Sequence, residues 1–253
     1  MSASSFEGAT TGRRLQTWGL SSSGPNTSLY QSLGSLRSRS RELIRNNPLV
    51  DGGVDSYAAN IIGSGISPRW QLEDTDLKMR IQELWGDWTD HADFTGTCDF
   101  YGLQTLGTRA LIDAGEFLVR LVPVSSFSPL PVPFQIQLIE ADHLDESYNA
   151  VAPNGNEIRM GIEVDSWGRR LAYWVYPEHP GESFLHSRFN ERIRIPSSEM
   201  IHVFKPLRIG QMRGRPWLAS IILKLRELDQ YEDAELVRKK TAAMFGGFIK
   251  EIS

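Results

Sequence analysis

The chain has 253 residues and a mass of 28.5 kDa, which is enough for one large α+β domain or two ordinary ones. Hydrophobic residues make up 40% and charged residues 23%, as in an ordinary soluble domain. No apolar run reaches the ~18–20 residues of a membrane span, and the polar N-terminus lacks a signal-peptide core. The single cysteine, Cys98, excludes an intramolecular disulfide and a cysteine-based zinc site. We therefore expect a protein of a reducing, intracellular environment that is neither membrane-embedded nor exported.

The net charge of −4 conceals a sharp asymmetry along the chain. Residues 1–50 carry 6 Lys/Arg and 2 Asp/Glu, residues 51–200 carry 11 and 23, and residues 201–253 carry 10 and 6. Positive ends around a negative middle are typical of a basic arm or a charged assembly surface. The whole chain is too acidic for tight, simple DNA binding, because such binding needs many contacts from Lys and Arg to phosphates.

The N-terminal residues 1–35 are rich in Ser, Gly and Thr and lack apolar periodicity, which predicts a polar, flexible arm. A first helix is expected from Leu36 to Arg45. Asn47 followed by Pro48 has the pattern of a helix cap with proline at the first helical position. This pattern predicts a second helix from Leu49 to Ile62.

The clearest amphipathic helix follows Asp74, which is a candidate cap. Apolar residues recur at the spacing of one helical face, at Leu77, Ile81, Leu84, Trp85 and Trp88. We interpret this face, including its two tryptophans, as buried core; a base-stacking platform is the alternative. A fourth helix is expected from about Asp99 to Asp113.

After Gly115 the apolar period changes from 3.6 to 2, which indicates strands. The predicted strands are Glu116–Val124, Phe134–Leu144, Glu157–Val164, Arg170–Tyr176, Arg192–Ile195 and Met200–Phe204. The third and fourth form a hairpin around residues 165–168, where Gly168 supplies a positive φ. The expected sheet is therefore mostly antiparallel.

A long closing helix is expected from Pro216. Its inward-facing residues are predicted to be Leu218, Ile221, Ile222, Leu225 and Leu228, then Tyr231, Leu236 and Val237. The order of helices, antiparallel sheet and long C-terminal helix predicts an α+β fold. We divide the chain into the arm at 1–35, an α+β domain at 36–215 and the closing helix at 216–253.

One cluster has the composition of a metal site. Glu140, Asp142, His143 and Asp145 lie within six residues, and carboxylates with a histidine can hold a divalent cation. On a strand, however, Asp142 and His143 would point to opposite faces, and no second acidic cluster completes a nuclease-type site. We favour a hydrogen-bonded corner and keep a metal-dependent nuclease as the rival hypothesis.

Other catalytic motifs are missing from the sequence. It contains no phosphate-binding loop of the Gly-x-x-x-x-Gly-Lys-Ser/Thr type and no Gly-x-Ser-x-Gly elbow. His202 lies on a predicted strand and is interpreted as structural. We therefore predict no catalytic residue, no cofactor and no enzymatic activity.

Six basic residues are candidates for contacts with a neighbouring subunit or with DNA. They are Arg37, Arg39, Arg41, Arg238, Lys239 and Lys240. For the run at 238–240, a solvated or intersubunit face is favoured over phosphate binding.

Several strings, in order along residues 37–250, resemble the lambda-type bacteriophage portal proteins. They are Arg41–Pro48 with Ala58–Gly63, Leu138–Leu144, Gly161–Asp165 with Trp167–Arg169, Ile201–Phe204 with Gly210–Leu218, and Tyr231–Val237. The resemblance implies a portal wing-like fold and a subunit of a ring, commonly of twelve, at one capsid vertex. Double-stranded DNA passes through such a ring without sequence-specific contacts during packaging and ejection. The terminase, the capsid and the head-completion proteins are the implied partners, in the virion and, during assembly, in the host cytoplasm.

Members of this family continue for roughly as many residues again. We therefore expect this chain to represent a truncated gene, a fragment or part of a longer product, without much of the clip, stem, channel loop and crown. The rivals to a portal subunit are the metal-dependent nuclease and a capsid adaptor that binds only protein.

Overall fold

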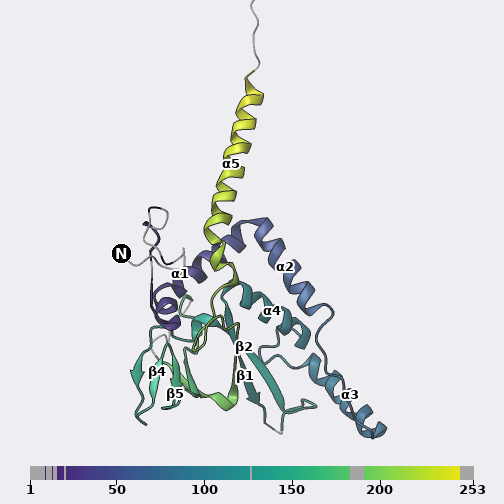
Figure 1. Ribbon diagram of the computed structural model, residues 1–253. Helices are drawn as coiled ribbons and strands as arrows, with labels where there is room; N and C mark the ends of the chain where they lie inside the picture. Colours follow the sequence, from purple (N-terminus) through teal and green to yellow (C-terminus); the bar gives the residue numbers. More distant parts are fainter. Residues whose placement is uncertain are drawn as a thin grey trace, which may run out of the picture.

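The computed structural model describes residues 9, 13, 16–19, 21–125, 127–182 and 191–245. Four helices precede two antiparallel sheets, and a long helix projects from the body at the C-terminal end (Figure 1). The predicted α+β fold class is thereby confirmed. Among the described residues, no helix has both the length and the apolarity needed to cross a membrane.

Helix α1 spans Pro25–Asn46, so the predicted start at Leu36 is wrong. Leu29 and Leu33 are buried and form a cluster with Met160 of the sheet region. The buried face continues through polar residues, including Arg37, so apolar periodicity underestimates this helix. The arm therefore contributes core from Pro25 onward.

Helices α2, α3 and α4 lie close to their predicted ranges, at Pro48–Ile62, Thr75–Asp90 and Phe100–Asp113. Two of their caps are the predicted ones, Asn47 and Asp74, and Asp99 is a third; all three side chains accept hydrogen bonds from first-turn backbone N–H groups. Such bonds satisfy donors that have no partner within the helix. Cap chemistry therefore sets these three boundaries.

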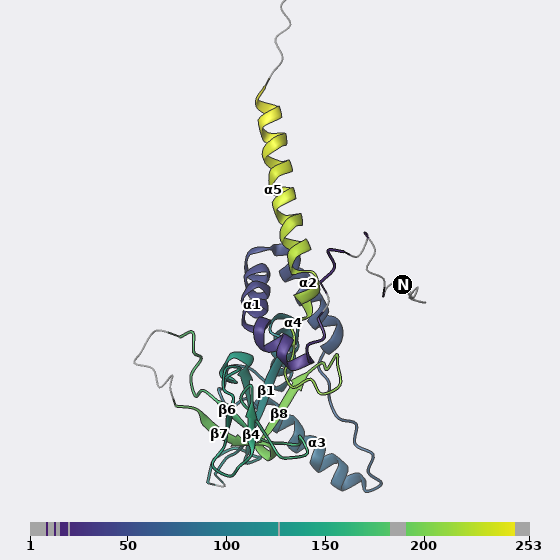
Figure 2. The same cartoon turned by 60° about the vertical axis from the view of Figure 1, so that its left-hand side comes forward.

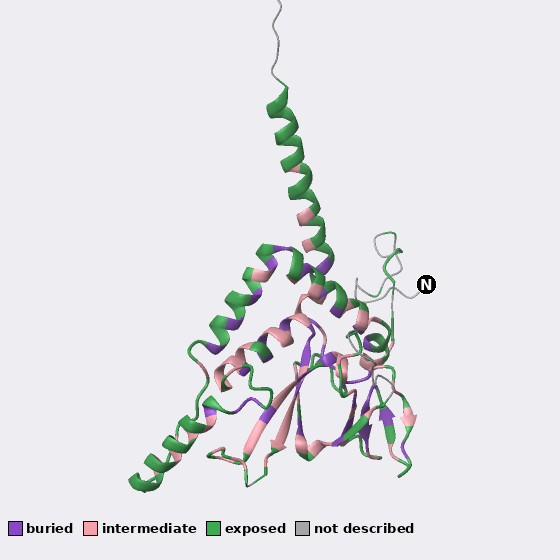
Figure 3. Ribbon diagram, turned by 180° about the vertical axis from the view of Figure 1, so that it is seen from behind, coloured by how far each residue is buried: buried purple, intermediate pink, exposed green. Residues whose placement is uncertain are grey.

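The predicted burial of the α3 face is wrong in part. This helix extends away from the body, and most of it is exposed (Figure 3). Leu77 and Leu84 are exposed, whereas Ile81, Trp85 and Trp88 are half-buried. The periodicity thus identifies an apolar face that this chain covers only incompletely.

The first sheet has three antiparallel strands in the order β2-β1-β8. Strand β1 spans Glu116–Pro123, β2 spans Phe134–Glu140 and β8 spans Met200–Phe204. Strand β2 ends four residues before its predicted end, because residues 141–143 form a 3₁₀ turn, η2.

The second sheet has five antiparallel strands in the order β3-β4-β5-β6-β7. Their bounds are Ala150–Val151, Glu157–Arg159, Ile162–Val164, Arg170–Val175 and Ile193–Pro196. The single strand predicted at 157–164 is instead a tight hairpin, since Met160 and Gly161 both have positive φ. A core that includes Leu118, Ile139, Tyr173 and Ile195 joins the two sheets.

The closing segment has two parts. A 3₁₀ turn, η4, spans Trp217–Ser220, and α5 spans Ile222–Met244. Only Ile222 of α5 is buried, so the predicted inward face beyond the first turns is wrong for this chain alone. Figure 2 shows α5 projecting from the body beside α1 and α2.

The corrected start of α1 gives a stability prediction. Leu33→Ala should lower the free energy of unfolding by about 2–5 kcal/mol, because Leu33 is fully buried. Thr27→Ala, an exposed position on the same helix, should change it by no more than about 0.5 kcal/mol. Urea denaturation measures both, and equal effects of the two substitutions would contradict a core role for this part of the chain.

Candidate assembly interface

The first residue of β1, Glu116, is a fully buried carboxylate at the centre of the body. One carboxylate oxygen accepts hydrogen bonds from Arg37 of α1 and Arg213, and the other accepts them from His202 of β8 and the Gly214 backbone N–H. Burial opposes the ionisation of Glu116. The charge of Arg213, the bond from His202 and the charge of Arg37 outweigh burial and hold the pKa of Glu116 well below its ordinary value.

Arg213 connects this carboxylate to both sheets. Its Nη1 donates to the Leu144 carbonyl at 3.1 Å and to the Met160 carbonyl at 2.9 Å, while Nη2 donates to the Ala141 carbonyl at 3.2 Å. The side chain is fully buried. The segment that leads into α5 is therefore held to the sheets through bonds to a charged group, which are stronger than neutral ones.

His202 completes the centre as a neutral imidazole. Arg170 Nη1 lies 2.8 Å from Nδ1, and because a guanidinium only donates, Nδ1 accepts and Nε2–H donates to Glu116 at 2.9 Å. Burial lowers the pKa of His202, against the raising effect of Glu116. The interpretation of His202 as a structural residue agrees with these contacts.

Two glycines allow the backbones to meet at this centre. Gly115 has φ +88°, and a Cβ there would lie 2.1 Å from the Arg215 carbonyl carbon. A Cβ on Gly214 would lie 2.1 Å from the Gly115 carbonyl oxygen. The segment before α5 can approach β1 this closely only because both positions lack a side chain.

Replacing the central carboxylate tests its role. Glu116→Gln should destabilise the fold by about 3–5 kcal/mol at neutral pH, because it leaves buried guanidinium groups without their charge partner. Glu157→Gln, which loses only the exposed pair with Arg159, is the control and should change the free energy of unfolding far less, because exposed ion pairs contribute little to stability.

The pH dependence of Glu116 has a defined sign. Folding lowers the pKa of Glu116, so its carboxylate stabilises the folded state fully when the pH is above its unfolded pKa, near 4.5. This stabilisation is lost as the pH falls from there toward the pKa of the folded state. The gap in unfolding free energy between wild type and Glu116→Gln should therefore narrow below about pH 4.5. A gap that stays constant from pH 7 to pH 3 would show that the carboxylate charge is not what stabilises the centre.

The structure separates the three basic candidates of α1. Arg37 is buried and pairs with Glu116 and Glu146, so it is not available as a subunit or DNA contact. Arg41 is half-buried against Glu140 and Asp142, both at 2.6 Å. Only Arg39 is exposed.

The acidic cluster is an ion-paired corner. Asp142 and His143 lie in the 3₁₀ turn η2 rather than on a strand, and His143 Nδ1 lies 2.8 Å from the Tyr176 carbonyl. Among the described residues, the histidine close enough to share a ligand position with Glu140 and Asp142 is His179. The guanidinium of Arg41 already occupies the space between the two carboxylates, which opposes a second cation there. The ion pairs with Arg41 therefore favour the hydrogen-bonded corner over a metal site at these residues.

Asp113, the last residue of α4, lies beside this corner. Its Oδ1 is buried and has no hydrogen-bond partner among the described residues. Burial raises the pKa of Asp113 to about 6; the charges of Arg41 and Arg109 lower it, and those of Glu140 and Asp142 raise it further. This carboxylate therefore opposes folding when it ionises.

The sign of this effect predicts a stabilising substitution. Because the folded pKa exceeds the unfolded value of 3.8, stability should fall as the pH rises from about 4 to about 6. Asp113→Asn removes this loss and should raise the unfolding free energy by about 2 kcal/mol at pH 7.5. Asp87→Asn, at an exposed position on α3, is the control, and thermal unfolding at pH 4.5 and pH 7.5 gives both values. Loss of stability in Asp113→Asn at pH 7.5 would contradict this account.

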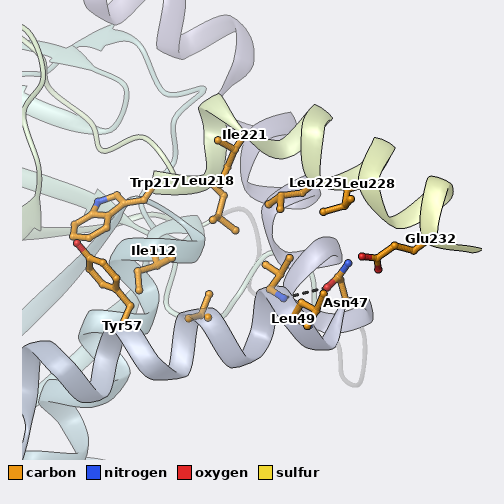
Figure 4. Close-up of a pocket in the computed structure, with 13 residues that line it drawn as sticks. Asn47, Leu49, Tyr57, Ile112, Trp217, Leu218, Ile221, Leu225, Leu228 and Glu232 are labelled. Carbon is orange, nitrogen blue, oxygen red and sulfur yellow. Dashed lines mark hydrogen bonds between the residues drawn. The ribbon is translucent and has the colours of Figure 1, made fainter.

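An apolar groove of about 370 Å³ lies where α5 leaves the body (Figure 4). Helix α2 contributes Leu49 and Tyr57, and the η4–α5 segment contributes Trp217, Leu225 and Leu228. The Tyr57 and Trp217 rings meet edge to face at 5.5 Å. The groove opens along the base of the projecting helix.

Asn47 fixes the other end of this groove. Its Oδ1 caps α2, while its Nδ2 donates to Asp229 Oδ1 of α5 at 2.8 Å. One side chain therefore joins the α1–α2 junction to α5. The sequence predicts the cap, but the bond to α5 has no local sequence signal.

Along its length, α5 exposes apolar side chains on more than one side. They are Leu223, Leu228, Tyr231, Leu236, Val237 and Met244. Arg238, Lys239 and Lys240 are also exposed, and Arg238 forms a pair with Glu235. A helix with apolar residues on several sides is typical of one that packs against more than one neighbour.

Sequence reasoning missed most of these residues. Nothing local marks Glu116, Arg213 or His202 as partners, because they meet only through tertiary packing. The exposed apolar residues of α5 do have a signal, since they fail to form a single helical stripe.

The chain also has relatives among known proteins. A match to the family described as "Phage portal protein, lambda family" covers residues 11–252. A probable portal protein of Halomonas phage phiHAP-1 is 31% identical over 88% of this chain and 44% of the relative. Two further relatives are each 22% identical over 94% of this chain. They are the portal protein of Escherichia phage N15, of which the match covers 48%, and portal protein B of Escherichia phage lambda, of which it covers 47%.

The chain therefore belongs to the lambda family of phage portal proteins. It spans about half the length of the curated relatives that it matches.

Proposed function

We propose that this chain is a portal subunit that assembles with further copies into a ring-shaped conduit for double-stranded DNA at a capsid vertex. The observation that carries the proposal is α5, a 23-residue helix, about 35 Å long, that projects from the body with apolar side chains on several sides. In a ring, each subunit contacts two neighbours through different surfaces. A projecting helix with several apolar sides suits such an arrangement.

The charge pattern supports a conduit rather than a tight DNA-binding protein. Residues 51–200 carry 23 acidic and 11 basic residues, so most of the body repels phosphate. Weak contacts favour passage, because tight phosphate contacts would oppose movement. Arg39, Arg238, Lys239 and Lys240 remain as candidate contacts with a neighbouring subunit or with DNA.

The remaining roles follow from family membership. We infer that the protein acts in genome packaging and ejection, with the terminase, capsid and head-completion proteins as partners. It would work in the virion and be assembled in the host cytoplasm. A structural role without catalysis agrees with the ion-paired state of Glu140 and Asp142 and with the buried side chain of His202.

Self-association tests the role of α5. Because the chain spans about half of its relatives, we expect weak association, stronger at about 50 mM than at about 500 mM salt, that continues beyond a dimer. Val237→Asp, at a 61% exposed position of α5, should abolish it. Phe127→Asp, at a 97% exposed loop position, should not. Sedimentation velocity distinguishes these outcomes; association that ends at a dimer, or that survives Val237→Asp, would count against a ring built through α5.

A further inference from the structure

An aromatic groove lies between α3 and β2, on a different flank from α5. It encloses about 300 Å³ and is lined by Trp70, Ile81, Leu84, Trp85, Trp88 and Phe134. Trp88 Nε1 donates to the Phe134 carbonyl at 2.7 Å, and Trp85 contacts Trp70 and Trp88 with ring centroids 5.9 and 5.0 Å apart. The walls are therefore fixed, although the groove stays open on one side.

Two properties of the groove define what would fit it. The Nε1 of Trp85 is buried and has no hydrogen-bond partner among the described residues, so an occupant that brings an acceptor would satisfy it. The surrounding segment 73–90 carries six acidic and two basic residues, so a cation beside the occupant would be favoured. The complementary partner is a compact apolar group with an adjacent acceptor and a positive charge.

The β5–β6 turn of the same chain presents such a group. Trp167 is 86% exposed, and the neighbouring Arg169 side chain is 78% exposed. Trp and Arg are the residue types most enriched at the energetic centres of protein interfaces. The backbone carbonyl of Ser166, next to Trp167, offers an acceptor that does not depend on the Ser166 side chain.

The turn is rigid before any partner binds. Asp165 Oδ1 accepts hydrogen bonds from the backbone N–H groups of Trp167 and Arg169, both at 2.9 Å, and Asp165 Oδ2 accepts from Arg169 Nε at 2.7 Å. Gly168, with φ +79°, closes the turn onto the Asp165 carbonyl. A preformed turn loses little conformational entropy on docking, which favours its use as a binding element.

The two features lie on opposite flanks of the body. The five-stranded sheet, which carries the turn, and α3, which carries the groove, flank the three-stranded sheet, both toward the end away from α5 (Figures 1 and 3). Copies arranged around a common axis would bring one flank of a subunit to the other flank of the next. The basic end of α5 also has suitable charge, but it projects from the other end of the body and cannot reach α3 in such a ring.

We propose that Trp167 of one copy inserts into the α3–β2 aromatic groove of the next copy, with Arg169 facing the acidic residues of α3. This inference rests on the proposed ring and names a contact within it. The contact is heterologous, because knob and groove are different surfaces, and it therefore propagates from copy to copy.

Disulfide trapping between two variants tests this contact. In a Cys98→Ser background, one variant carries Ser166→Cys in the turn and the other carries Leu84→Cys at the groove. After mixing and mild oxidation, the yield of cross-linked dimer should be at least about tenfold higher than for either variant alone. The reason is that a specific contact holds the two thiols at a much higher local concentration than random collision does. Leu223→Cys, exposed on α5, replaces Leu84→Cys in the control mixture and should give only the background level.

A second substitution separates a specific contact from mere proximity. Adding Trp167→Ala to the turn variant should reduce cross-linking to background, whereas adding Phe127→Ala should leave it unchanged. Both positions are exposed, so neither substitution should alter the melting temperature. Equal cross-linking with Leu223→Cys, or cross-linking that survives Trp167→Ala, would overturn the proposal.

The result also separates this proposal from the proposed ring. Rings without the 166–84 cross-link would overturn the knob-and-groove contact and leave the portal function intact. The specific cross-link in a protein that forms only open chains would support the contact and contradict ring closure by this chain.

Discussion

The body of this protein depends on one buried carboxylate. Glu116 receives hydrogen bonds from α1, from β8 and from the segment before α5, and Arg213 extends the same centre to three carbonyls around the second sheet. An isolated charge at such a site would be very costly, so each partner is required by the others. Because the partners come from distant parts of the sequence, the centre enforces a single arrangement of α1, both sheets and the origin of α5. Gly115 and Gly214 contribute by allowing the backbones to approach.

This centre explains why the outer surfaces can remain apolar and open. The body is fixed by internal charge pairs, so α3, the β5–β6 turn and most of α5 are not needed to hold it together. All three expose large apolar side chains, among them Leu77, Trp167 and Val237. In a protein that functions as an isolated molecule, such exposed apolar side chains would promote aggregation. In a ring of copies, it provides the area through which neighbours pack, while the acidic body limits adhesion to DNA.

The sequence predicts those elements whose signals are local. Asn47 and Asp74 mark helix starts because a cap acts within three residues of itself. Gly168 marks a turn through a local signal as well, because glycine readily adopts the positive φ that the turn needs. The start of α1 is missed because only Leu29 and Leu33 mark its buried face before Leu36, within a Ser- and Gly-rich segment whose composition is typical of a flexible arm. The burial of α3 is overestimated because periodicity reveals an apolar face and not what covers it. At the acidic corner, the residue near Glu140 and Asp142 is His179 and not the adjacent His143, since chain proximity does not determine spatial proximity.

The central claim is that this fold is built for closed, head-to-tail assembly. Electron microscopy of negatively stained protein, concentrated at low salt and lightly cross-linked, tests it most directly. The account predicts ring-shaped particles with a central opening, with incomplete arcs among them, because contacts between two different surfaces repeat from copy to copy and close when the rotation between neighbours completes a circle. Uniform two-fold dimers, or monomers alone at every concentration, would contradict it.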